Sequence, residues 1–288
     1  MALLLLASSL SAQTPLQDEI RKIAADARGK VSVACLLSRS ELNCDLEAHS
    51  RPPMQSVFKL PLAAYAPHLV EAGKFTLGQP IRFLPNDRIL PHTHSPLQDQ
   101  YPDGDVDVLL RELLRLAVSE SDNVAADIML RNVGGPSDVT GYITSLGAQG
   151  FHLEDGERGL ARDVSVQYRN WFEPAGAVQL LRRISDNSPP TPEHTRLLLS
   201  WLSESPTGPH GIRGQLPTGT VVMHKTGTSN TRGAVTFVTN DIGLITLPDG
   251  RRLALAVFVT DSKADEATRD AVIARIAKAA YSAAVAAH

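Results

Sequence analysis

The sequence predicts an α/β fold in which both ends of the chain build an antiparallel sheet flanked by helices, while the middle is mainly helical. Residues 220–224 and 233–262 have the composition of successive β-strands, and residues 248–250, Pro-Asp-Gly, are typical of a hairpin turn. Residues 265–285 have apolar side chains at helical spacing, and residues 56–183 are mostly helical in pattern. Strand-like ends around a helical middle indicate an α/β unit that carries a helical insertion.

The first segment, residues 1–12, is predicted to be a secretory signal, because an apolar run is followed by small residues. It is too short to span a bilayer, and no later segment approaches about 18 uncharged apolar residues. Charged residues make up 20% of the chain and the formal net charge is -3, which argues against binding to nucleic acid or an anionic membrane. We therefore expect an exported, periplasmic monomer without membrane insertion.

A helix is predicted at residues 15–27, followed by two strand-like runs around a turn at Arg39 and Ser40. Cys35 and Cys44 would then face each other across a hairpin. A disulfide is possible there in an oxidising compartment. Two buried, reduced thiols on neighbouring strands fit the pattern equally well, so the sequence leaves both states open.

The central block contains four predicted helices. Their ranges are 107–118, 123–133, 173–184 and 191–202. The second is stopped by Gly134-Gly135-Pro136, and the last two begin near a proline, which suits a first helical turn.

Ser56 lies three residues before Lys59 in an otherwise apolar run. Serine is a favoured helix N-cap, and an isolated S-x-x-K occurs by chance about once in a chain of this size. Two further triplets follow, Ser121-Asp122-Asn123 between two helices and Lys225-Thr226-Gly227 after a strand. S-x-x-K, S-D-N and K-T-G in this order are a signature of serine acyl-transfer enzymes.

With these motifs, the chain resembles the class A serine β-lactamases over nearly its whole mature length, and is most similar to the branch containing the PER and VEB enzymes. The closer likeness rests on the passages "PMQSVFKLPL", "SPLQDQYPDG", "VSESDN", "QYRNW" and "HKTGTS". The resemblance implies hydrolysis of the β-lactam amide of penicillins and cephalosporins through a serine acyl-enzyme, which gives antibiotic resistance. It implies a small-molecule substrate and no cofactor.

The resemblance also implies the class A β-lactamase/transpeptidase-like fold, with the site in a cleft between two domains. We assign residues 13–52 together with 197–288 to the α/β domain, and residues 53–196 to the mainly α-helical domain.

The expected catalytic residues are Ser56, Lys59, Ser121 and Glu157. A helix beginning near Ser56 would bring Ser56 and Lys59 together, because residues three apart on a helix are neighbours. Serine needs a base, which is Lys59 or Glu157 acting through a water, and the sequence leaves the choice open. Ser121 would return a proton to the lactam nitrogen. Glu157 is assigned as the deacylating glutamate because of its distance before "QYRNW". Without that spacing it would be interpreted as a solvated charge in a loop.

The resemblance implies a second set of residues that bind the substrate. These are Asn123, Lys225, Thr226, Gly227, Thr228 and His94. Thr226 and Thr228 would bind the substrate carboxylate, and Gly227 would keep the strand edge open for it. The backbone N–H groups of Ser56 and Thr228 would form the oxyanion hole.

Two positions depart from the family pattern. Ala161 stands where class A enzymes usually carry an asparagine that holds the hydrolytic water, and where the nearest relatives have histidine. His94 stands where relatives commonly place tryptophan, on the rim of the cleft. His92 and His94 form H-x-H, but no third ligand at metal spacing follows, so no metal site is predicted.

Two alternatives share the same motifs. One is a D,D-peptidase or esterase, and the other is a β-lactam-binding protein that is acylated without turnover. Glu157 argues against both, because a carboxylate beside the ester can activate water and release the product.

Overall fold

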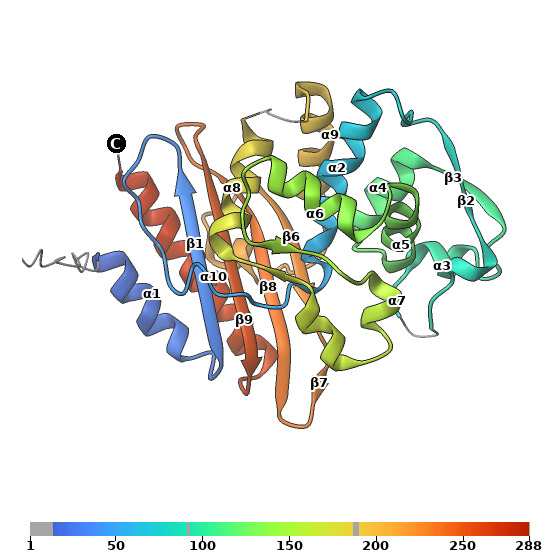
Figure 1. The fold of residues 1–288 in the computed structure, drawn as a ribbon. Coiled ribbons are helices and arrows are strands. Elements are labelled where there is room, and N and C mark those ends of the chain that lie inside the picture. The colour runs from blue at the N-terminus through green and yellow to red at the C-terminus, as the bar shows by residue number, and fades with distance from the viewer. Residues whose placement is uncertain (1–13, 91–92, 187–189, 288) are drawn as a thin grey trace, which may run out of the picture.

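The structure, a computed structural model, describes residues 14–90, 93–186 and 190–287. The predicted signal segment at residues 1–12 and His92 lie outside the described residues. Among the residues that are described, no helix has the length and apolar character needed to cross a bilayer. The predicted α/β fold is confirmed, as the arrangement of the sheet and helices shows (Figure 1).

The central sheet is antiparallel and has the strand order β1-β9-β8-β6, with β7 paired to β8. Its strands are β1 (Lys30–Leu37), β6 (Val222–Thr228), β7 (Thr231–Arg232), β8 (Val235–Thr246) and β9 (Arg252–Ser262). Lys30 pairs with Thr260, so the N-terminal strand lies beside one of the last strands of the chain. Residues 248–250 turn the chain between β8 and β9, as predicted.

Helices cover both faces of this sheet (Figure 1). Helices α1 (Pro15–Ala25) and α10 (Glu266–Ala286) pack on one face, where Ile20, Val257 and Ile276 belong to one apolar core. Helix α8 (Pro174–Ser185) and the central helices cover the other face and share a second core with it. The sheet is therefore the middle of three layers.

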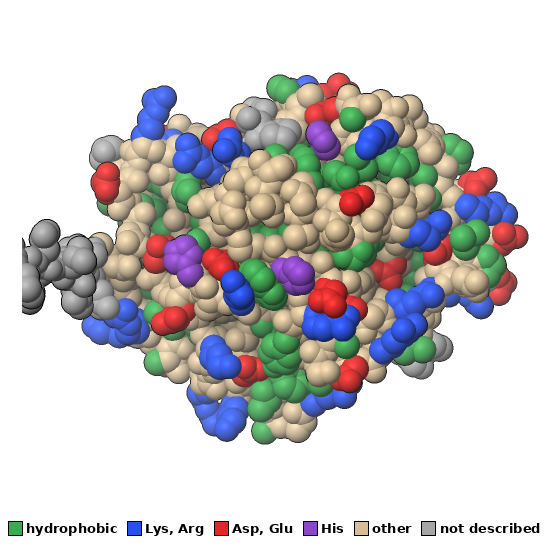
Figure 2. Space-filling model, viewed as in Figure 1, with side chains coloured by type: hydrophobic (Ala, Val, Ile, Leu, Met, Phe, Trp, Pro, Cys, Tyr) green, Lys and Arg blue, Asp and Glu red, His purple; other side chains and the backbone are tan. Residues whose placement is uncertain are grey.

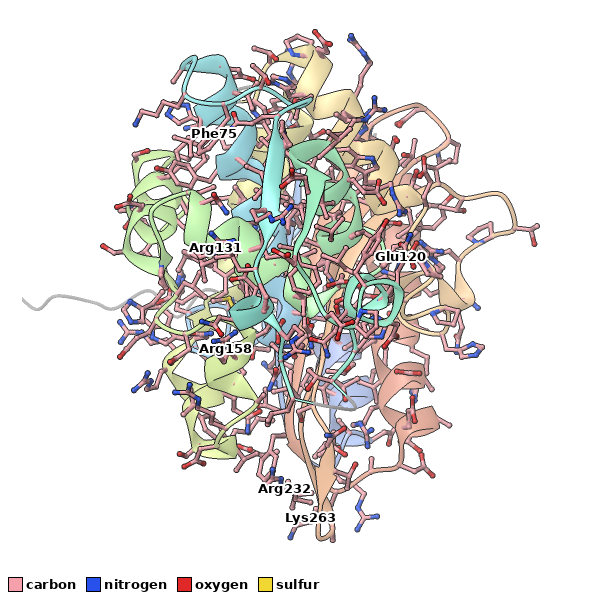
Figure 3. The ribbon with its side chains drawn as sticks, turned by 90° about the vertical axis from the view of Figure 1, so that its right-hand side faces the viewer. Phe75, Glu120, Arg131, Arg158, Arg232 and Lys263 are labelled. Atoms are coloured by element: carbon pink, nitrogen blue, oxygen red, sulfur yellow. A yellow bond between two sulfur atoms is a disulfide. The ribbon has the colours of Figure 1, made fainter. Side chains whose placement is uncertain are left out.

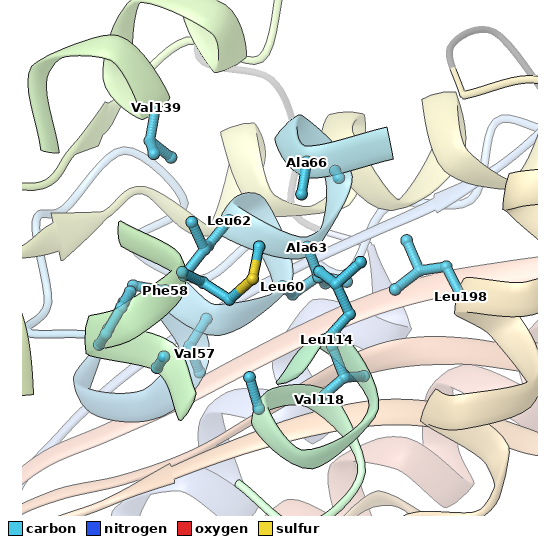
Figure 4. Packing of buried hydrophobic residues seen from close by; sticks show 14 of the residues in the cluster. Val57, Phe58, Leu60, Leu62, Ala63, Ala66, Leu114, Val118, Val139 and Leu198 are labelled. Carbon is cyan, nitrogen blue, oxygen red and sulfur yellow. The ribbon is translucent and has the colours of Figure 1, made fainter. Parts of the chain in front are cut away.

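The helical region surrounds α2, which runs directly on from the segment that carries Ser56. Its helices are α2 (Lys59–Glu71), α3 (Pro96–Gln100), α4 (Leu110–Val118), α5 (Asn123–Asn132), α6 (Pro136–Ser145), α7 (Glu157–Leu160) and α9 (Pro192–Ser203). Leu60 and Ala63 of α2 are buried against Leu114 of α4 and Leu198 of α9 (Figure 4). Each fully buried leucine contributes about 1.5–3 kcal/mol, so α2 is a firm support for the residues at its start.

The helix predicted at residues 107–118 begins later, at Leu110, and this part of the prediction was wrong. Residues 106–109 form β3 (Val106–Leu109), which pairs with β2 (Pro80–Phe83). Val108 lies opposite Ile81 and both are buried, so strand pairing wins over continuation of the helix. A further short pair, β4 (Phe151–His152) and β5 (Trp171–Phe172), closes the segment between α6 and α8.

The second strand of the predicted cysteine hairpin is absent from the described chain. Only Leu46 makes a bridge, with Val33, because the preceding segment bonds to the start of α1 instead, where Gln17 Nε2 donates to Asn43 Oδ1 at 3.2 Å. Cys35 and Cys44 nevertheless form a disulfide with their Cα atoms 5.4 Å apart. The structure therefore selects the oxidised state from the two that the sequence left open.

Charged side chains on the molecule's visible face are mixed in sign. Lys and Arg side chains alternate with Asp and Glu across that face, without a broad patch of either sign (Figure 2). This distribution agrees with the small net charge of -3.

Candidate active site

Ser56 lies in a 3-10 turn, Gln55–Phe58, and not in the first turn of an α-helix as predicted. Residues i and i+3 nearly eclipse in a 3-10 turn, so Lys59 still comes beside Ser56. Ser56 Oγ accepts a hydrogen bond from Lys59 Nζ at 3.0 Å and donates one to Glu157 Oε1 at 3.1 Å. The hydroxyl is therefore not used as a helix cap.

Lys59 is fully buried, and its ammonium is surrounded by acceptors. Besides Ser56 Oγ, Lys59 Nζ donates to Ser121 O at 2.7 Å and to Asn123 Oδ1 at 2.5 Å. It also lies 2.9 Å from Glu157 Oε1. A buried cation requires such partners, since an unpaired one would cost several kcal/mol. Lys59 thus joins all of the motifs except K-T-G.

Ser121 joins α4 to α5 with a left-handed backbone, φ +57°. The capping role in this triplet belongs to Asp122, whose side chain accepts from Ala125 N at 2.8 Å and from Ser95 Oγ at 2.8 Å. Ser121 is left free to turn its hydroxyl to the site, where it accepts from Lys225 Nζ at 2.8 Å.

Lys225, on β6, is completely buried and also donates to Thr226 O at 2.9 Å. Burial and the nearby charge of Lys59 lower the pKa of Lys225 to about 7. Ser121 therefore contacts both lysines, Lys59 through its backbone oxygen and Lys225 through its hydroxyl. The adjacent Thr226 donates from its hydroxyl to Thr207 Oγ1 at 2.9 Å, a contact that sequence reasoning missed.

Glu157 is the first residue of α7, and its position is fixed by a second carboxylate. The backbone N–H groups of Glu157 and Arg158 donate to Asp127 Oδ1 at 2.7 Å and Oδ2 at 2.9 Å. Burial, followed by repulsion from Glu157, raises the pKa of Asp127 to about 6. Sequence reasoning missed Asp127, although a carboxylate within the apolar pattern of α5 was a signal for it.

Residues just before β5 hold the segment that carries Glu157 in place. Asn170 Oδ1 accepts from the N–H groups of Glu154 and Asp155 at 2.9 and 3.0 Å, and Arg169 binds the Asp155 carboxylate through two nitrogens at 2.8 and 2.6 Å. The backbone oxygen of Asn170 also accepts from Met54 N at 3.2 Å. The loop and the chain leading to Ser56 are therefore held together.

These groups face a cavity of about 890 Å³. The predicted site residues that line it are Ser56, His94, Ser121, Asn123, Glu157, Thr226 and Thr228. Ala161 lines it as well. Lys59 and Lys225 lie immediately behind this wall, bonded to Ser56 and Ser121. The ring of His94 is hydrogen-bonded through Nε2 to the Glu120 backbone oxygen at 2.7 Å.

Gly227, predicted to keep the strand edge open for the ligand, also has a packing role in β6. A Cβ atom at Gly227 would collide with the backbone oxygen of Met54 and lie 3.2 Å from Val57 N. Glycine is required because β6 passes close to the 3-10 turn that holds Ser56.

Two glutamines on the cavity wall also escaped the sequence analysis. Gln55, with φ +46° directly before Ser56, donates from Nε2 to Gln167 Oε1 at 2.9 Å. No motif marks either residue, and they are 112 positions apart in the chain.

The fold, and the order in which the three motifs enter one cavity, define a serine acyl-transfer enzyme. The profile of the Beta-lactamase enzyme family matches residues 15–284, and the chain belongs to that family. It is 38% identical to "Extended-spectrum beta-lactamase PER-1" of Pseudomonas aeruginosa over 94% of this chain and 88% of that protein. It is 31% identical to "Beta-lactamase VEB-1" of the same organism over 90% and 87%.

Among solved structures, a β-lactamase from Chitinophaga pinensis DSM 2588 is similar at a TM-score of 0.90 and 41% identity, over 94% of this chain and all of that one (100%). The resemblance to class A enzymes of the PER and VEB branch is thereby confirmed.

Proposed function

We propose that this β-lactamase hydrolyses the lactam amide of penicillins and cephalosporins through an acyl-enzyme on Ser56. The observation that carries the proposal is that Ser56 Oγ lies 3.0 Å from Lys59 Nζ and 3.1 Å from Glu157 Oε1. Hydrolysis of β-lactams would give antibiotic resistance to the cell that makes the protein.

Acylation begins when Ser56 Oγ attacks the lactam carbonyl carbon and its proton passes to a base. Glu157 Oε1 accepts the Ser56 Oγ hydrogen bond directly, and Lys59 Nζ, 3.0 Å from Oγ, can take the proton when it is in its neutral amine form. The C–N bond then breaks, and the ring nitrogen takes a proton from Ser121, whose hydroxyl is restored by the proton that left Ser56. Lys225 supports this transfer, because its contact with Ser121 Oγ holds the hydroxyl in place.

Substrate binding uses the opposite wall of the cavity. Thr226 and Thr228 bind the carboxylate next to the lactam ring, and the protonated form of Lys225 attracts it. Asn123 binds the acyl-side-chain amide, and His94 stacks on a substrate ring at the rim. The N–H groups of Ser56 and Thr228 stabilise the oxyanion.

Deacylation depends on Glu157, which takes a proton from water as the water attacks the ester. This step separates a β-lactamase from a D,D-peptidase or a β-lactam-binding protein of the same fold. The carboxylate is held by Lys59 and, through its backbone, by Asp127. Glu157 is therefore held beside Ser56 Oγ, the atom on which the ester forms.

The cleft between the α/β region (residues 13–52 with 197–288) and the helical region (residues 53–196) is the proposed place of the reaction. The Cys35–Cys44 disulfide supports an oxidising compartment, and the proposed location is the periplasm. We further propose that the protein works as a monomer, which sedimentation of the active enzyme tests.

Turnover of a chromogenic cephalosporin tests the function. We expect continuous hydrolysis by the native enzyme, and no hydrolysis and no covalent adduct by mass spectrometry with Ser56→Ala. Ser203→Ala, at an exposed serine of α9, is the matched control and keeps full activity. A single burst without further turnover would favour the non-hydrolytic alternative, and an adduct on Ser56→Ala would remove Ser56 from its role.

A further inference from the structure

A second cavity of about 610 Å³ lies beside the active-site cavity, on the other side of Ala161. Leu90 and Ala161 line both cavities, so the two spaces share a wall. Ala161 lies one helical turn after Glu157, and its backbone N–H donates to Glu157 O at 2.9 Å. Side chains one turn apart are about 5–6 Å from each other, so the second cavity begins close to the reacting groups.

The charged side chains that line this second cavity, named here the arginine annex, are all cationic. They are Arg88, Arg158 and Arg162, and no described carboxylate lines it. None of the three forms an ion pair with a carboxylate within the described ranges. Their positive charge is therefore not neutralised locally.

Hydrogen bonds to neutral backbone oxygens hold two of these guanidinium groups in place. Arg88 donates to Pro85 O and Pro102 O at 3.0 Å each. Arg158 donates to Arg88 O at 3.1 Å and to Asn86 O, so it bridges from α7 to the loop after β2 (Figure 3). Carbonyl partners fix the guanidinium geometry without cancelling its charge.

The chemistry of the annex fits a carboxylate on a hydrocarbon arm. Arginine side chains bind carboxylates with paired, charge-assisted hydrogen bonds, and a bound anion relieves the repulsion among three like charges. Ile89, Leu90 and Pro102 add apolar surface to the same cavity. An organic acid suits this lining better than a bare inorganic anion does.

Ala161 controls the connection between the two cavities. Its side chain is a single methyl group at an exposed position. A larger side chain at this position would separate the two cavities, whereas the methyl group leaves them connected. We propose that the arginine annex binds the terminal carboxylate of the acyl side chain of a β-lactam that is seated at Ser56. The proposal rests on the proposed function and names a substrate class for it.

Two cephalosporins with one nucleus test the proposal, one with a glutaryl side chain ending in a free carboxylate and the other its methyl ester. For the native enzyme, we expect a higher kcat/KM on the acid. In Arg162→Gln the acid-to-ester ratio of kcat/KM should fall about two- to fivefold, the range for a partly exposed charge pair. Turnover of the ester should stay unchanged, and Arg162→Lys should recover part of the ratio. The ratio should also fall in high salt.

Arg196→Gln, at an exposed arginine of α9, is the matched control and should leave the ratio unchanged. An unchanged ratio in Arg162→Gln, or an equal loss on both substrates, would overturn the annex. Inhibition of acid and ester alike by free glutarate, with no dependence of the ratio on Arg162, would show that the annex takes a separate anion and would also overturn the proposal. Failure of the native enzyme to hydrolyse even the ester would instead overturn the proposed function.

Discussion

The hydroxyl of Ser56 stands between a cation and an anion. It accepts from Lys59 and donates to Glu157, and these two groups are themselves 2.9 Å apart. Each of the three groups is thus held by the other two. A change at one of them should therefore alter a particular step of the reaction while the others stay in place.

Glu157→Gln should leave acylation possible and stall deacylation. The amide cannot take a proton from water, whereas Lys59 remains within reach of Ser56 for the first step. Incubation with a penicillin followed by mass spectrometry should show an acyl-enzyme that persists for many native turnover times. Glu154→Gln, on the exposed side of the same loop, is the control. Native-rate turnover by Glu157→Gln would contradict the assignment.

Ala161→Asn should speed deacylation modestly, because the new amide can hold the hydrolytic water that a methyl group cannot. One hydrogen bond is worth about 0.5–1.5 kcal/mol, which is up to roughly tenfold in rate if it acts only in the transition state. Pre-steady-state kinetics of both proteins would measure this. Absence of a burst in the native enzyme, with no gain in the variant, would show that another group already orders the water.

Most of the residues that the sequence predicted at the site belong to motifs, and Glu157 was placed by its register. Short motifs predicted Ser56, Lys59, Ser121 and Lys225, because the acyl-transfer reaction accepts few other residue types at these positions. Asp127, by contrast, acts through a contact with backbone N–H groups 30 positions away, and any loop sequence supplies such groups. Contacts of this kind leave little trace in a single sequence.

At the scale of elements, the contact between α5 and α7 decides where Glu157 stands. α7 is only one turn long and has no capping side chain of its own. Its first N–H groups are satisfied instead by Asp127 of α5. The position of the catalytic loop is therefore a property of the helical region to which it is attached.

Asp127→Asn should change how stability depends on pH. The pKa of Asp127 is raised from 3.8 to about 6, so the folded protein binds this proton more tightly than the unfolded chain does. The cost of the charged form is fully present above about pH 6 and disappears as the pH falls towards 4. Relative to Asp127→Asn, the native free energy of unfolding should therefore rise by up to about 3 kcal/mol between pH 7 and pH 4.

Urea unfolding across this pH range measures the difference, with the exposed Asp103→Asn as a control. A difference that is constant with pH would contradict a raised pKa for Asp127.

The elements that were predicted correctly are those with long, regular patterns, such as α10, β8 and β9. The errors lie in short segments with two possible partners. Residues 107–109 fit the helical period of α4, yet Val108 gains a buried neighbour in β2. Residues 41–46 alternate like a strand, yet Asn43 is bonded to Gln17 of α1. Tertiary contacts decide whether such short segments become helix, strand or loop. The local sequence pattern carries no information about those contacts.

At the scale of the whole molecule, the disulfide fastens the outer edge of the sheet. Cys35 and Cys44 belong to the core between the sheet and the terminal helices, on the opposite face from Val57 beside the nucleophile. Replacing both by serine should lower the free energy of unfolding by about 3 kcal/mol, because the unfolded chain gains entropy when the short loop is no longer closed. The kcat of the folded variant should be unchanged. Urea unfolding and steady-state kinetics test this, and a loss of kcat in folded protein would contradict it.

The pairing of β1 with β9 also has a consequence for how the molecule is made. Lys30 pairs with Thr260, so during synthesis the first strand has no partner strand until almost the entire chain exists. Contacts across such a long stretch close slowly, because a large loop must be ordered first. The sheet can therefore form fully only in a complete chain. A chain released before residue 252 lacks β9, the strand that joins β1 to β8. Such a fragment would keep its β1 edge open and remain a substrate for proteases, so only full-length molecules would persist.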